Sequence, residues 1–536
     1  MTATSPASDP FAEFCRLAAS GAGLVAVHET VSADLLTPLS AYLRLVTPAS
    51  PTAGLPGTPT PQGTSRSFLL ESVEGGEHLA RYSFLGAEPA MVVRSRNGQT
   101  TVEDASGIRM EPGTAVEVVR RELSQRKLAT AENVAPMAGG CVGYLGYAAS
   151  RWFDPAMQAV AGTDDDAVFL IFRTVLAFDH ARQQIQIRTL AEVEPGASQE
   201  ELRRSYESAA AKNREVVRRL SAAVELPIKA EAVGSAGEAE FDSNFERAEF
   251  EHAVAEGKEL IYAGECFQIV LSQRFRRKTT ADAVALYRAL RATNPSPYMF
   301  LLKLGPLPSP QHANHGRAGD PGETGVEQAL IGASPEMLVR CRDRELTYRP
   351  IAGTRPRGAD AEADAQLACE LLADQKECAE HMMLVDLGRN DLGRVARYGS
   401  VKVNKLKIVE KYSHVQHIVT ELKAELRPDL DRFDALGACF PAGTVTGAPK
   451  IRAMQGIAEL ERGARQAYAG AVLYADYANN LDSCITIRTM ELSGDEVSVQ
   501  AGAGVVADSV PATEWEETVN KSRALRRAIA LAESEG

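Results

Sequence analysis

Residues 377–394 read ECAEHMMLVDLGRNDLGR, and this stretch decides how the rest of the chain is interpreted. Glu377 and Glu380 are three residues apart among apolar side chains, a spacing that places both carboxylates on one face of a helix. A second stretch near the C-terminus repeats the arrangement with Glu514 and Glu517 on another expected helix. If the two helices face each other, the four glutamates form one cluster.

Four carboxylates in one pocket repel one another, and a bound cation relieves that repulsion. Oxygen ligands without His or Cys nearby suit Mg²⁺. The alternative is a pair of solvated helix faces, because most glutamates are exposed and glutamates three residues apart are common in helices. The spacing alone favours this alternative, whereas the motifs around it favour a metal site.

The composition is that of a soluble globular protein. Of 536 residues, 45 % are hydrophobic and 24 % are charged, which allows either two large domains or one large α+β domain. No stretch approaches the roughly 18 apolar residues needed to cross a bilayer, and the N-terminus lacks the pattern of a signal peptide, so we expect a cytoplasmic protein with no membrane association. A net charge of −13 argues against a nucleic-acid partner. The eight cysteines have no metal-type spacing and are expected to be reduced.

The pattern of predicted helices and strands changes near residue 240. We therefore expect an N-terminal part, residues 1–240, and a C-terminal part, residues 241–536. Residues 49–65 and 305–326 are rich in Pro, Gly and small residues and predict two surface loops. Residues 167–190 predict two strands joined by a polar turn.

Several motifs in the C-terminal part suit an anionic ligand. Gly353 and Thr354 form a turn that offers a backbone N–H and a hydroxyl. Arg488 lies in an alternating strand and would clamp a carboxylate if it pointed into a pocket, although on the surface it would mean little. Gly502 and Gly504 would let a ligand approach the backbone. These residues predict a small dicarboxylate bound with the help of Mg²⁺, and they leave the reaction open.

Six separated motifs resemble the chorismate-utilising enzyme family, and within it the large subunits of anthranilate synthases. The motifs are PIAGTRPRG (350–358), DLGRNDLGRV (386–395), SHVQHIV (413–419), FPAGTVTGAPK (440–450), CITIRT (484–489) and AGAGVVADSVPATEWEET (501–518). They occur in the family's order, and the resemblance covers the chain from about Leu69. It implies an α+β fold, a large sandwich of two antiparallel sheets with helices outside.

The resemblance implies a metal site and a substrate. Glu380 and Glu517 match direct Mg²⁺ ligands, and Glu377 and Glu514 match residues that support them. The substrate is expected to be chorismate, with the metal on its ring carboxylate. Arg488 and the other holders of the enolpyruvyl carboxylate complete the site. The expected substrate-binding residues are Gly353, Thr354, Tyr468, Arg488, Gly502 and Gly504.

The expected catalytic residues are Glu336, His417 and Thr354. Glu336 matches the glutamate proposed to protonate the departing 4-hydroxyl, a role that needs a raised pKa. His417 matches a histidine linked to catalysis, although a single histidine in an alternating strand is more often structural.

Two positions discriminate within the family. Ala352 stands where aminodeoxychorismate synthases often carry a lysine, and Gln268 stands where isochorismate and salicylate synthases carry the lysine that activates water. Ammonia needs no such base, so the resemblance implies amination at C2, loss of the 4-hydroxyl, and elimination of pyruvate to give anthranilate. No glutaminase motif is visible. A separate glutamine amidotransferase subunit, and therefore a hetero-oligomer, is implied.

Residues 69–72 and 81–83, together with residues 294–299, resemble the pocket through which tryptophan inhibits the family. This resemblance makes the N-terminal part regulatory and the C-terminal part catalytic. The alternative is a plain strand-and-turn core. The residues expected to bind tryptophan are Leu70, Glu71, Ser72, Pro295, Tyr298 and Met299. Three rival functions remain open: an enzyme that stops at aminodeoxyisochorismate, an inactive regulatory subunit, and a generic Mg²⁺-dependent lyase.

Overall fold

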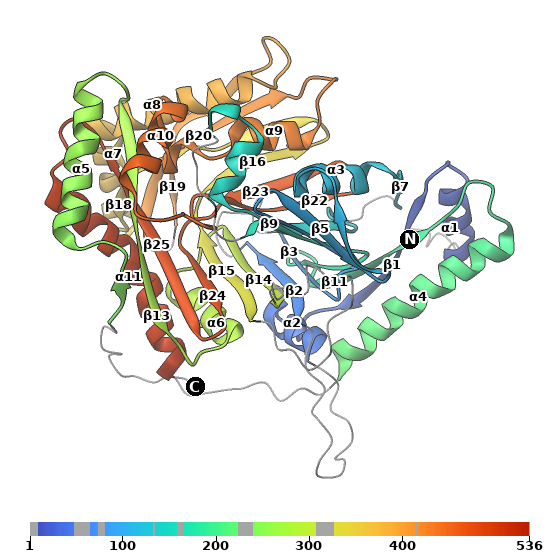
Figure 1. Cartoon of the computed structure of the whole chain (residues 1–536). Helices are drawn as coiled ribbons and strands as arrows, with labels where there is room; N and C mark the ends of the chain where they lie inside the picture. Colours follow the sequence, from blue (N-terminus) through green and yellow to red (C-terminus); the bar gives the residue numbers. More distant parts are fainter. Residues whose placement is uncertain are drawn as a thin grey trace.

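Two large β-sheets packed face to face, with helices on their outer faces, make up the fold (Figure 1). The computed structural model describes residues 9–47, 65–72, 81–131, 135–157, 162, 165–222, 240–306, 326–412 and 415–534. The expected α+β sandwich of two largely antiparallel sheets is confirmed. The two predicted loops lie outside the described residues except at their ends.

The larger sheet has thirteen strands. In order they are β12 (Asp242–Ser243), β13 (Gln268–Lys278), β25 (Glu496–Val505), β24 (Thr489–Ser493), β15 (Glu327–Ser334), β14 (Tyr298–Pro306), β2 (Arg66–Glu71), β3 (Tyr82–Ala87), β10 (Thr174–Asp179), β11 (Gln184–Glu192), β1 (Leu24–Ser32) and β7 (Leu128–Ala129), with β21 (Gly447–Ala448) paired to β13.

The smaller sheet has twelve strands. In order they are β18 (Ile351–Pro356), β20 (Val415–Glu425), β17 (Glu345–Tyr348), β16 (Met337–Arg342), β23 (Leu481–Ile485), β22 (Ala471–Asp476), β8 (Gly140–Leu145), β9 (Asp165–Phe172), β4 (Met91–Arg96), β5 (Gln99–Asp104) and β6 (Gly107–Glu111), with β19 (Lys402–Lys411) paired to β20.

Each sheet divides into one block of strands that precede residue 240 and one block that follow it. In the larger sheet the blocks meet where β14 pairs with β2, and in the smaller sheet where β22 pairs with β8. The blue-to-teal strands and the yellow-to-red strands accordingly occupy different sides of Figure 1. Both parts of the chain therefore contribute to both sheets.

The expectation of two strands within residues 167–190 is wrong, because this segment contributes to three strands, β9, β10 and β11. The chain leaves the smaller sheet after β9 and enters the larger sheet with β10, and Arg173 is the single residue between them. Both strands are buried along almost their whole length, and two polar residues, Arg173 and Thr174, interrupt the apolar run at the change of sheet. Such a short interruption does not by itself predict that the chain leaves one sheet for another.

The space between the sheets is filled by apolar side chains from both. Phe68 and Phe300 come from the larger sheet, and Val168 and Phe172 come from the smaller one. The rings of Phe68 and Phe172 meet edge to face with centroids 4.7 Å apart, a favourable geometry for aromatic pairs. This layer fixes how the two sheets face each other.

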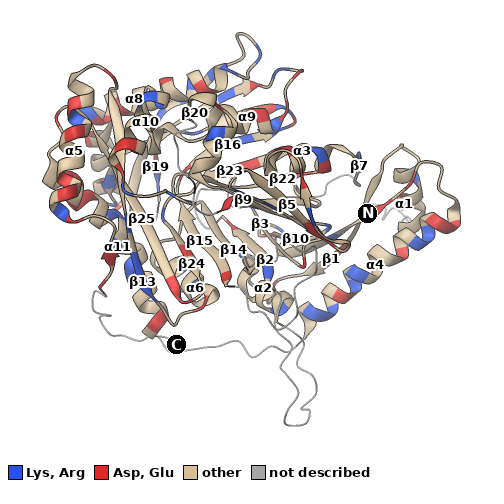
Figure 2. Cartoon of the chain, in the orientation of Figure 1, with Lys and Arg blue, Asp and Glu red and all other residues tan. Residues whose placement is uncertain are grey.

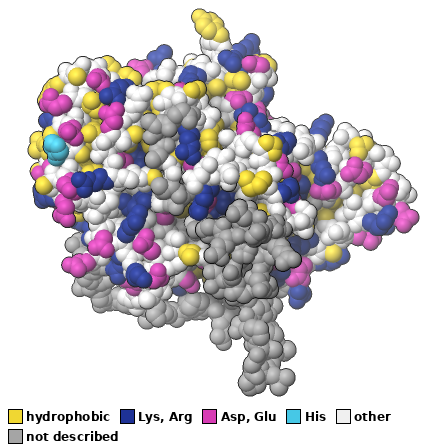
Figure 3. Space-filling view, in the orientation of Figure 1, with side chains coloured by type: hydrophobic (Ala, Val, Ile, Leu, Met, Phe, Trp, Pro, Cys, Tyr) yellow, Lys and Arg dark blue, Asp and Glu magenta, His cyan; other side chains and the backbone are white. Residues whose placement is uncertain are grey.

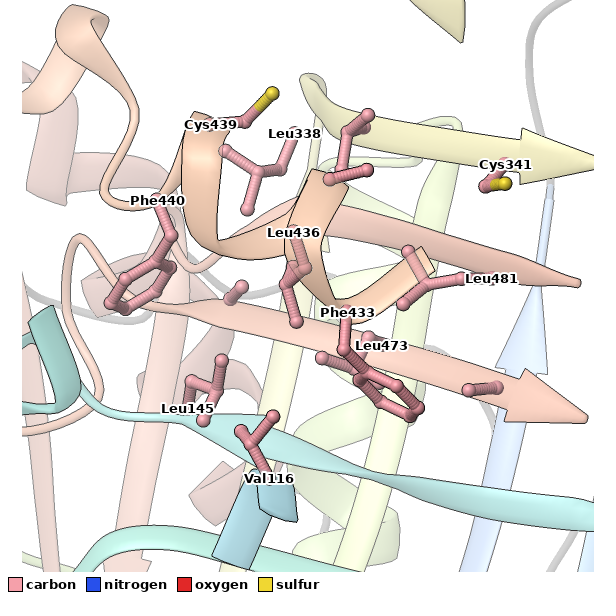
Figure 4. Close-up of a cluster of buried hydrophobic side chains, with 14 of the residues drawn as sticks. Val116, Leu145, Leu338, Cys341, Phe433, Leu436, Cys439, Phe440, Leu473 and Leu481 are labelled. Atoms are coloured by element: carbon pink, nitrogen blue, oxygen red, sulfur yellow. The ribbon is translucent and has the colours of Figure 1, made fainter. Parts of the chain in front are cut away.

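Helices cover the outer faces of both sheets. They are α1 (Pro10–Ala18), α2 (Pro38–Val46), α3 (Ala115–Ser124), α4 (Gln199–Ser221), α5 (Arg247–Tyr262), α6 (Ala283–Thr293), α7 (Ala361–Ala373), α8 (Gln375–Gly393), α9 (Arg432–Cys439), α10 (Lys450–Leu460) and α11 (Pro511–Ser534). Figure 4 shows Phe433 and Leu436 of α9 over Leu473 and Leu481 of the smaller sheet. None of the described helices is long and apolar enough to span a membrane.

Charged residues lie mainly on the outside. The long helix α4 carries both signs of charge along its length (Figure 2), and the face of the molecule seen in Figure 3 intersperses basic and acidic side chains. Ser198 caps α4 by accepting a hydrogen bond from the backbone N–H of Glu201, whose side chain bonds back to Ser198. This capping box explains why the charged segment begins its helix there.

Candidate active site

A pocket of about 270 Å³ gathers residues from β13, β25, α8, α11 and the loops between them. Six of its lining residues were singled out from the sequence: Gln268, Glu336, Tyr468, Arg488, Gly502 and Gly504. Pockets of this kind, with a few convergent polar groups, are the usual setting of a ligand site.

Glu336 lies between β15 and β16 and is almost completely buried. Its backbone carbonyl accepts a hydrogen bond from the N–H of Ile485, which fixes the residue against β23. Burial raises the pKa of the Glu336 carboxyl to about 8, against the smaller opposing effects of the Thr444 hydroxyl and the Lys521 charge. At neutral pH the side chain is therefore mostly protonated and can donate a proton.

Arg488 is a partly buried cation with no acidic partner in the described part of the chain. Its backbone is in the left-handed region, with φ of 49°, and its carbonyl accepts a hydrogen bond from Ala333. Burial lowers the pKa of its guanidinium. A strained backbone that holds an uncompensated positive charge at a pocket wall is the arrangement that an anionic ligand would complete.

The two glycines of β25 lie close against neighbouring side chains. A Cβ atom on Gly502 would lie 2.5 Å from the Tyr468 hydroxyl oxygen, and one on Gly504 would lie 2.6 Å from Nε2 of Gln268. Burial raises the pKa of Tyr468 to about 12, so the phenol stays neutral and can donate a hydrogen bond. The wall of the pocket is thus bare backbone with a phenol beside it.

His417, in β20, is held by the neighbouring strand β18. Its Nδ1 lies 3.0 Å from the Gly353 carbonyl oxygen and 3.1 Å from the Thr354 hydroxyl. Because a carbonyl only accepts, Nδ1 carries the proton and Nε2 is left as the basic nitrogen. Burial, with a contribution from the Arg488 charge, lowers the pKa of His417 and keeps the ring neutral. The structure therefore brings the three residues together, next to the pocket lining rather than within it.

Glu377 and Glu380 lie at the start of α8, as the spacing predicted. Asp374 caps this helix by accepting hydrogen bonds from the N–H groups of Lys376 and Glu377. Glu377 pairs with Arg355 at 3.5 Å. Burial raises the pKa of Glu380, and the charges of Glu377 and Glu517 raise it further.

Glu514 and Glu517 lie in the first turns of α11. Glu514 is buried, and its Oε2 has no hydrogen-bond partner. Burial and the charge of Glu517 raise the pKa of Glu514. Glu517 forms an ion pair with Lys521, whose Nζ is 2.6 Å from Oε1 of Glu517 and 3.0 Å from the carbonyl oxygen of Gly502.

These carboxylates fit a hard divalent cation by their chemistry. Their donors are all oxygen, one buried oxygen of Glu514 lacks a partner, and the charge of Glu517 on α11 acts on Glu380 of α8. Among the described residues, however, no three His, Cys, Asp or Glu side chains are gathered closely enough to hold a metal ion. The four-glutamate Mg²⁺ site stays a prediction.

Sequence reasoning missed three polar residues of the pocket, Thr444, Gln500 and Lys521. Lys521 follows Glu517 by four residues, so helical spacing would have placed it on the same face. Thr444 lies inside one of the six motifs but carries no periodic signal. Gln500 is oriented by the Arg274 side chain, a pairing that only the folded chain reveals.

The segments expected to bind tryptophan lie side by side. Strand β2 pairs with β14 so that Glu71 is opposite Met299. Glu71 is buried, accepts a hydrogen bond from the Tyr287 hydroxyl and pairs with Arg291 at 3.1 Å. The Tyr298 hydroxyl lies 3.3 Å from Oδ1 of Asp482. Tryptophan binding at Leu70, Ser72, Pro295 and their neighbours stays a prediction.

Comparison with known proteins identifies the class. The family model for chorismate binding enzymes matches residues 65–527, and the chain belongs to that family. Anthranilate synthase component 1 of Pseudomonas aeruginosa is 39% identical to it over 528 residues, which cover 97% of this chain and 98% of that protein.

Solved structures of other proteins share this fold. Anthranilate synthase component I from Streptococcus pneumoniae has a TM-score of 0.68 and 32% identity, covering 93% of this chain and 99% of that one. The menaquinone-specific isochorismate synthase of Escherichia coli has a TM-score of 0.64 over 97% of this chain and 100% of its own, at 19% identity, and shows that the fold is shared.

Proposed function

We propose that this chain is the large subunit of an anthranilate synthase and converts chorismate and ammonia to anthranilate, pyruvate and water. The observation that carries the proposal is one pocket lined by two residues. Arg488 is a partly buried cation without an acidic partner among the described residues, and Glu336 is a carboxyl that keeps its proton near neutral pH. Chorismate has carboxylates to be bound and a hydroxyl that must be protonated to leave. Arg488 can bind a carboxylate of chorismate, and Glu336 can protonate its hydroxyl.

Arg488 binds the enolpyruvyl carboxylate through two parallel N–H groups. The neutral Tyr468 phenol adds a third donor, and the bare backbone at Gly502 and Gly504 leaves the space that the carboxylate occupies. A buried ion pair formed with the ligand compensates the cost of burying the guanidinium.

The first chemical step forms a bond between ammonia and C2 of the ring while the ring double bonds shift. The bond between C4 and oxygen breaks as Glu336 gives its proton to the hydroxyl, which departs as water. The ammonium group on C2 then loses a proton, which restores Glu336. In the second step His417 takes the proton from C2 through Nε2, the bond between C3 and oxygen breaks, and the released enolpyruvyl group gains a proton to become pyruvate. The ring becomes aromatic.

Glu380 and Glu517 are the residues that would hold Mg²⁺, supported by Glu377 and Glu514. Bound there, the cation supplies positive charge for the ring carboxylate of chorismate.

The nucleophile comes from outside the chain. Ala352 and Gln268 carry no amine at the positions where related enzymes use lysine, and the Gln268 side chain lines the pocket beside Gly504. We infer that a separate glutamine amidotransferase subunit delivers ammonia, which makes the working enzyme a hetero-oligomer. Feedback inhibition by tryptophan at the pairing of β2 with β14 belongs to the same proposal.

Anthranilate fluorescence tests the proposal. The purified chain is supplied with chorismate, Mg²⁺ and an ammonium salt at high pH, with and without tryptophan. Fluorescence that requires the metal and falls with tryptophan supports reaction, cofactor and regulation together. Chorismate consumed without fluorescence would indicate aminodeoxyisochorismate or isochorismate as the product, and untouched chorismate would favour the inactive regulatory subunit.

A further inference from the structure

Lys521 connects the carboxylates of α11 with the wall of the pocket. Its Nζ lies 2.6 Å from Oε1 of Glu517 and 3.0 Å from the carbonyl oxygen of Gly502, and its side chain lines the pocket. Its charge also acts on Glu336 and Glu514. Helical spacing of four residues explains why it reaches Glu517, and the packing of α11 against β25 explains why it reaches Gly502.

We propose that Lys521 is an internal cation that exchanges with the divalent metal. Without metal its ammonium neutralises Glu517, and when the metal binds Glu517 the ammonium is released into the pocket, where it binds a carboxylate of the substrate. This inference rests on the proposed function for the identity of the metal and of the substrate.

The argument starts from the oxygen that both cations need. An ammonium 2.6 Å from Oε1 of Glu517 occupies one of the two carboxylate oxygens that a metal could use, and two cations on one carboxylate repel each other. Lys521 keeps a second partner, the carbonyl of Gly502, on the pocket side. The charge of Lys521 therefore stays beside the substrate after the ammonium leaves Glu517.

The exchange couples binding of the metal to binding of the substrate. A metal that releases Lys521 increases the positive charge available to a substrate carboxylate, and by reciprocity a bound substrate that holds Lys521 increases the affinity for the metal. Removing Lys521 should thus strengthen metal binding and weaken substrate binding. A merely structural lysine would weaken both or change neither.

Lys376 is the matched control. It lies 3.9 Å from Glu380, its side chain is 76% exposed, and it is absent from the pocket lining. Lys376→Met removes one positive charge near the same carboxylates without touching the exchange.

The experiment is calorimetric titration of MgCl₂ into the full chain after treatment with EDTA, without chorismate, paired with the KM for chorismate at saturating Mg²⁺. Lys521→Met should bind Mg²⁺ roughly three- to tenfold more tightly than the wild type, the range expected from loss of a partly exposed ion pair and one repelling charge. Its KM for chorismate should rise about tenfold or more. Lys521→Arg should keep the wild-type affinity for Mg²⁺, and Lys376→Met should stay within about twofold.

Equal or weaker Mg²⁺ binding by Lys521→Met overturns the exchange and leaves the proposed function standing. No Mg²⁺ binding by either wild type or variant overturns the exchange together with the metal in the proposed function. Lys521→Gln repeats the comparison with a side chain that can still donate to Gly502, should the methionine variant fail to fold.

Discussion

A Cβ atom on Gly502 would lie 2.5 Å from the hydroxyl oxygen of Tyr468, a separation that side chains in folded proteins do not adopt. Gly502 is in β25 of the larger sheet, whereas Tyr468 lies in the turn that leads into β22 of the smaller sheet. Their contact therefore packs this turn against the larger sheet at the pocket.

Gly502→Ala should raise the KM for chorismate at least about tenfold, because the added methyl group displaces the phenol and fills the carboxylate site. The free energy of unfolding should fall by about 1–3 kcal/mol. Steady-state kinetics and denaturant unfolding measure the two effects. Gly393→Ala in α8, where a Cβ meets nothing within 4 Å, is the control and should change neither. Normal kinetics in Gly502→Ala would place the substrate elsewhere.

Replacing Arg488 should separate function from stability. Arg488→Lys keeps the charge but loses the paired N–H groups, so the KM for chorismate should rise about tenfold or more. Arg488→Met removes a partly buried cation that has no carboxylate partner among the described residues, so the protein should become more stable, by at most about 1 kcal/mol, while losing activity. The exposed Arg397, paired with Glu425, supplies the control Arg397→Met. A destabilised Arg488→Met would mean that the guanidinium is compensated within the protein.

Glu336→Gln should lower kcat by about 10²-fold or more, because the amide cannot protonate the leaving hydroxyl. For the wild type, the rate per free ammonia should fall as the pH rises through about 8, since only the protonated carboxyl is active. Glu327→Gln, at the start of β15, the strand that precedes Glu336, is the control and should keep normal activity. An unchanged pH profile in Glu336→Gln would assign the acid to another residue.

Glu336→Gln, which should lower kcat, should raise the free energy of unfolding. The folded pKa of Glu336 is raised from 4.5 to about 8, so the native state binds more protons than the unfolded state between these values, and stability is lost as the pH rises across this window. At pH 7 the glutamine variant should be more stable by about 3 kcal/mol, and near pH 4 the difference should vanish. Thermal unfolding at both pH values measures it.

Glu517→Gln should reduce Mg²⁺-dependent turnover about 10²-fold or more, because the amide is a poor metal ligand. Anthranilate formation is followed against Mg²⁺ concentration. Glu516→Gln, next to it but exposed and paired with Arg247, is the control. Full activity in Glu517→Gln would remove the carboxylate site from the mechanism.

Ser72→Ala and Met299→Thr should each raise the tryptophan concentration needed for half inhibition, by about fivefold or more, while kcat stays near normal. Met490→Thr removes an equally buried methionine two strands away and controls for loss of stability. Unchanged inhibition in both variants would mean that tryptophan binds outside the pairing of β2 with β14.

The spacing of residues in the sequence was enough to predict part of the site. The spacing of Glu377 and Glu380 predicted one helical face, and α8 presents it because Asp374 caps the helix three residues before Glu377. The resemblance then supplied Glu336, Tyr468 and the glycines, whose meeting in one pocket depends on strand pairings far apart in the chain.

Other features could not be read from the sequence. The change of sheet at Arg173 is marked in the sequence only by two polar residues between apolar stretches, and such a pair does not distinguish a strand that continues from one that crosses over. The partners of the glutamates were also missed, because Arg355 and Lys521 reach them with long flexible side chains whose direction is set by packing.

The meeting of the two blocks of strands at one pairing per sheet has a consequence for how the chain can be divided. A break between residues 222 and 240 leaves two fragments, each with one newly exposed edge strand in each sheet. Such edges aggregate when uncovered, so neither fragment should persist alone in solution. Produced together, the fragments carry edges of matching register, β2 for β14 and β8 for β22, and should reassemble into an active two-piece enzyme.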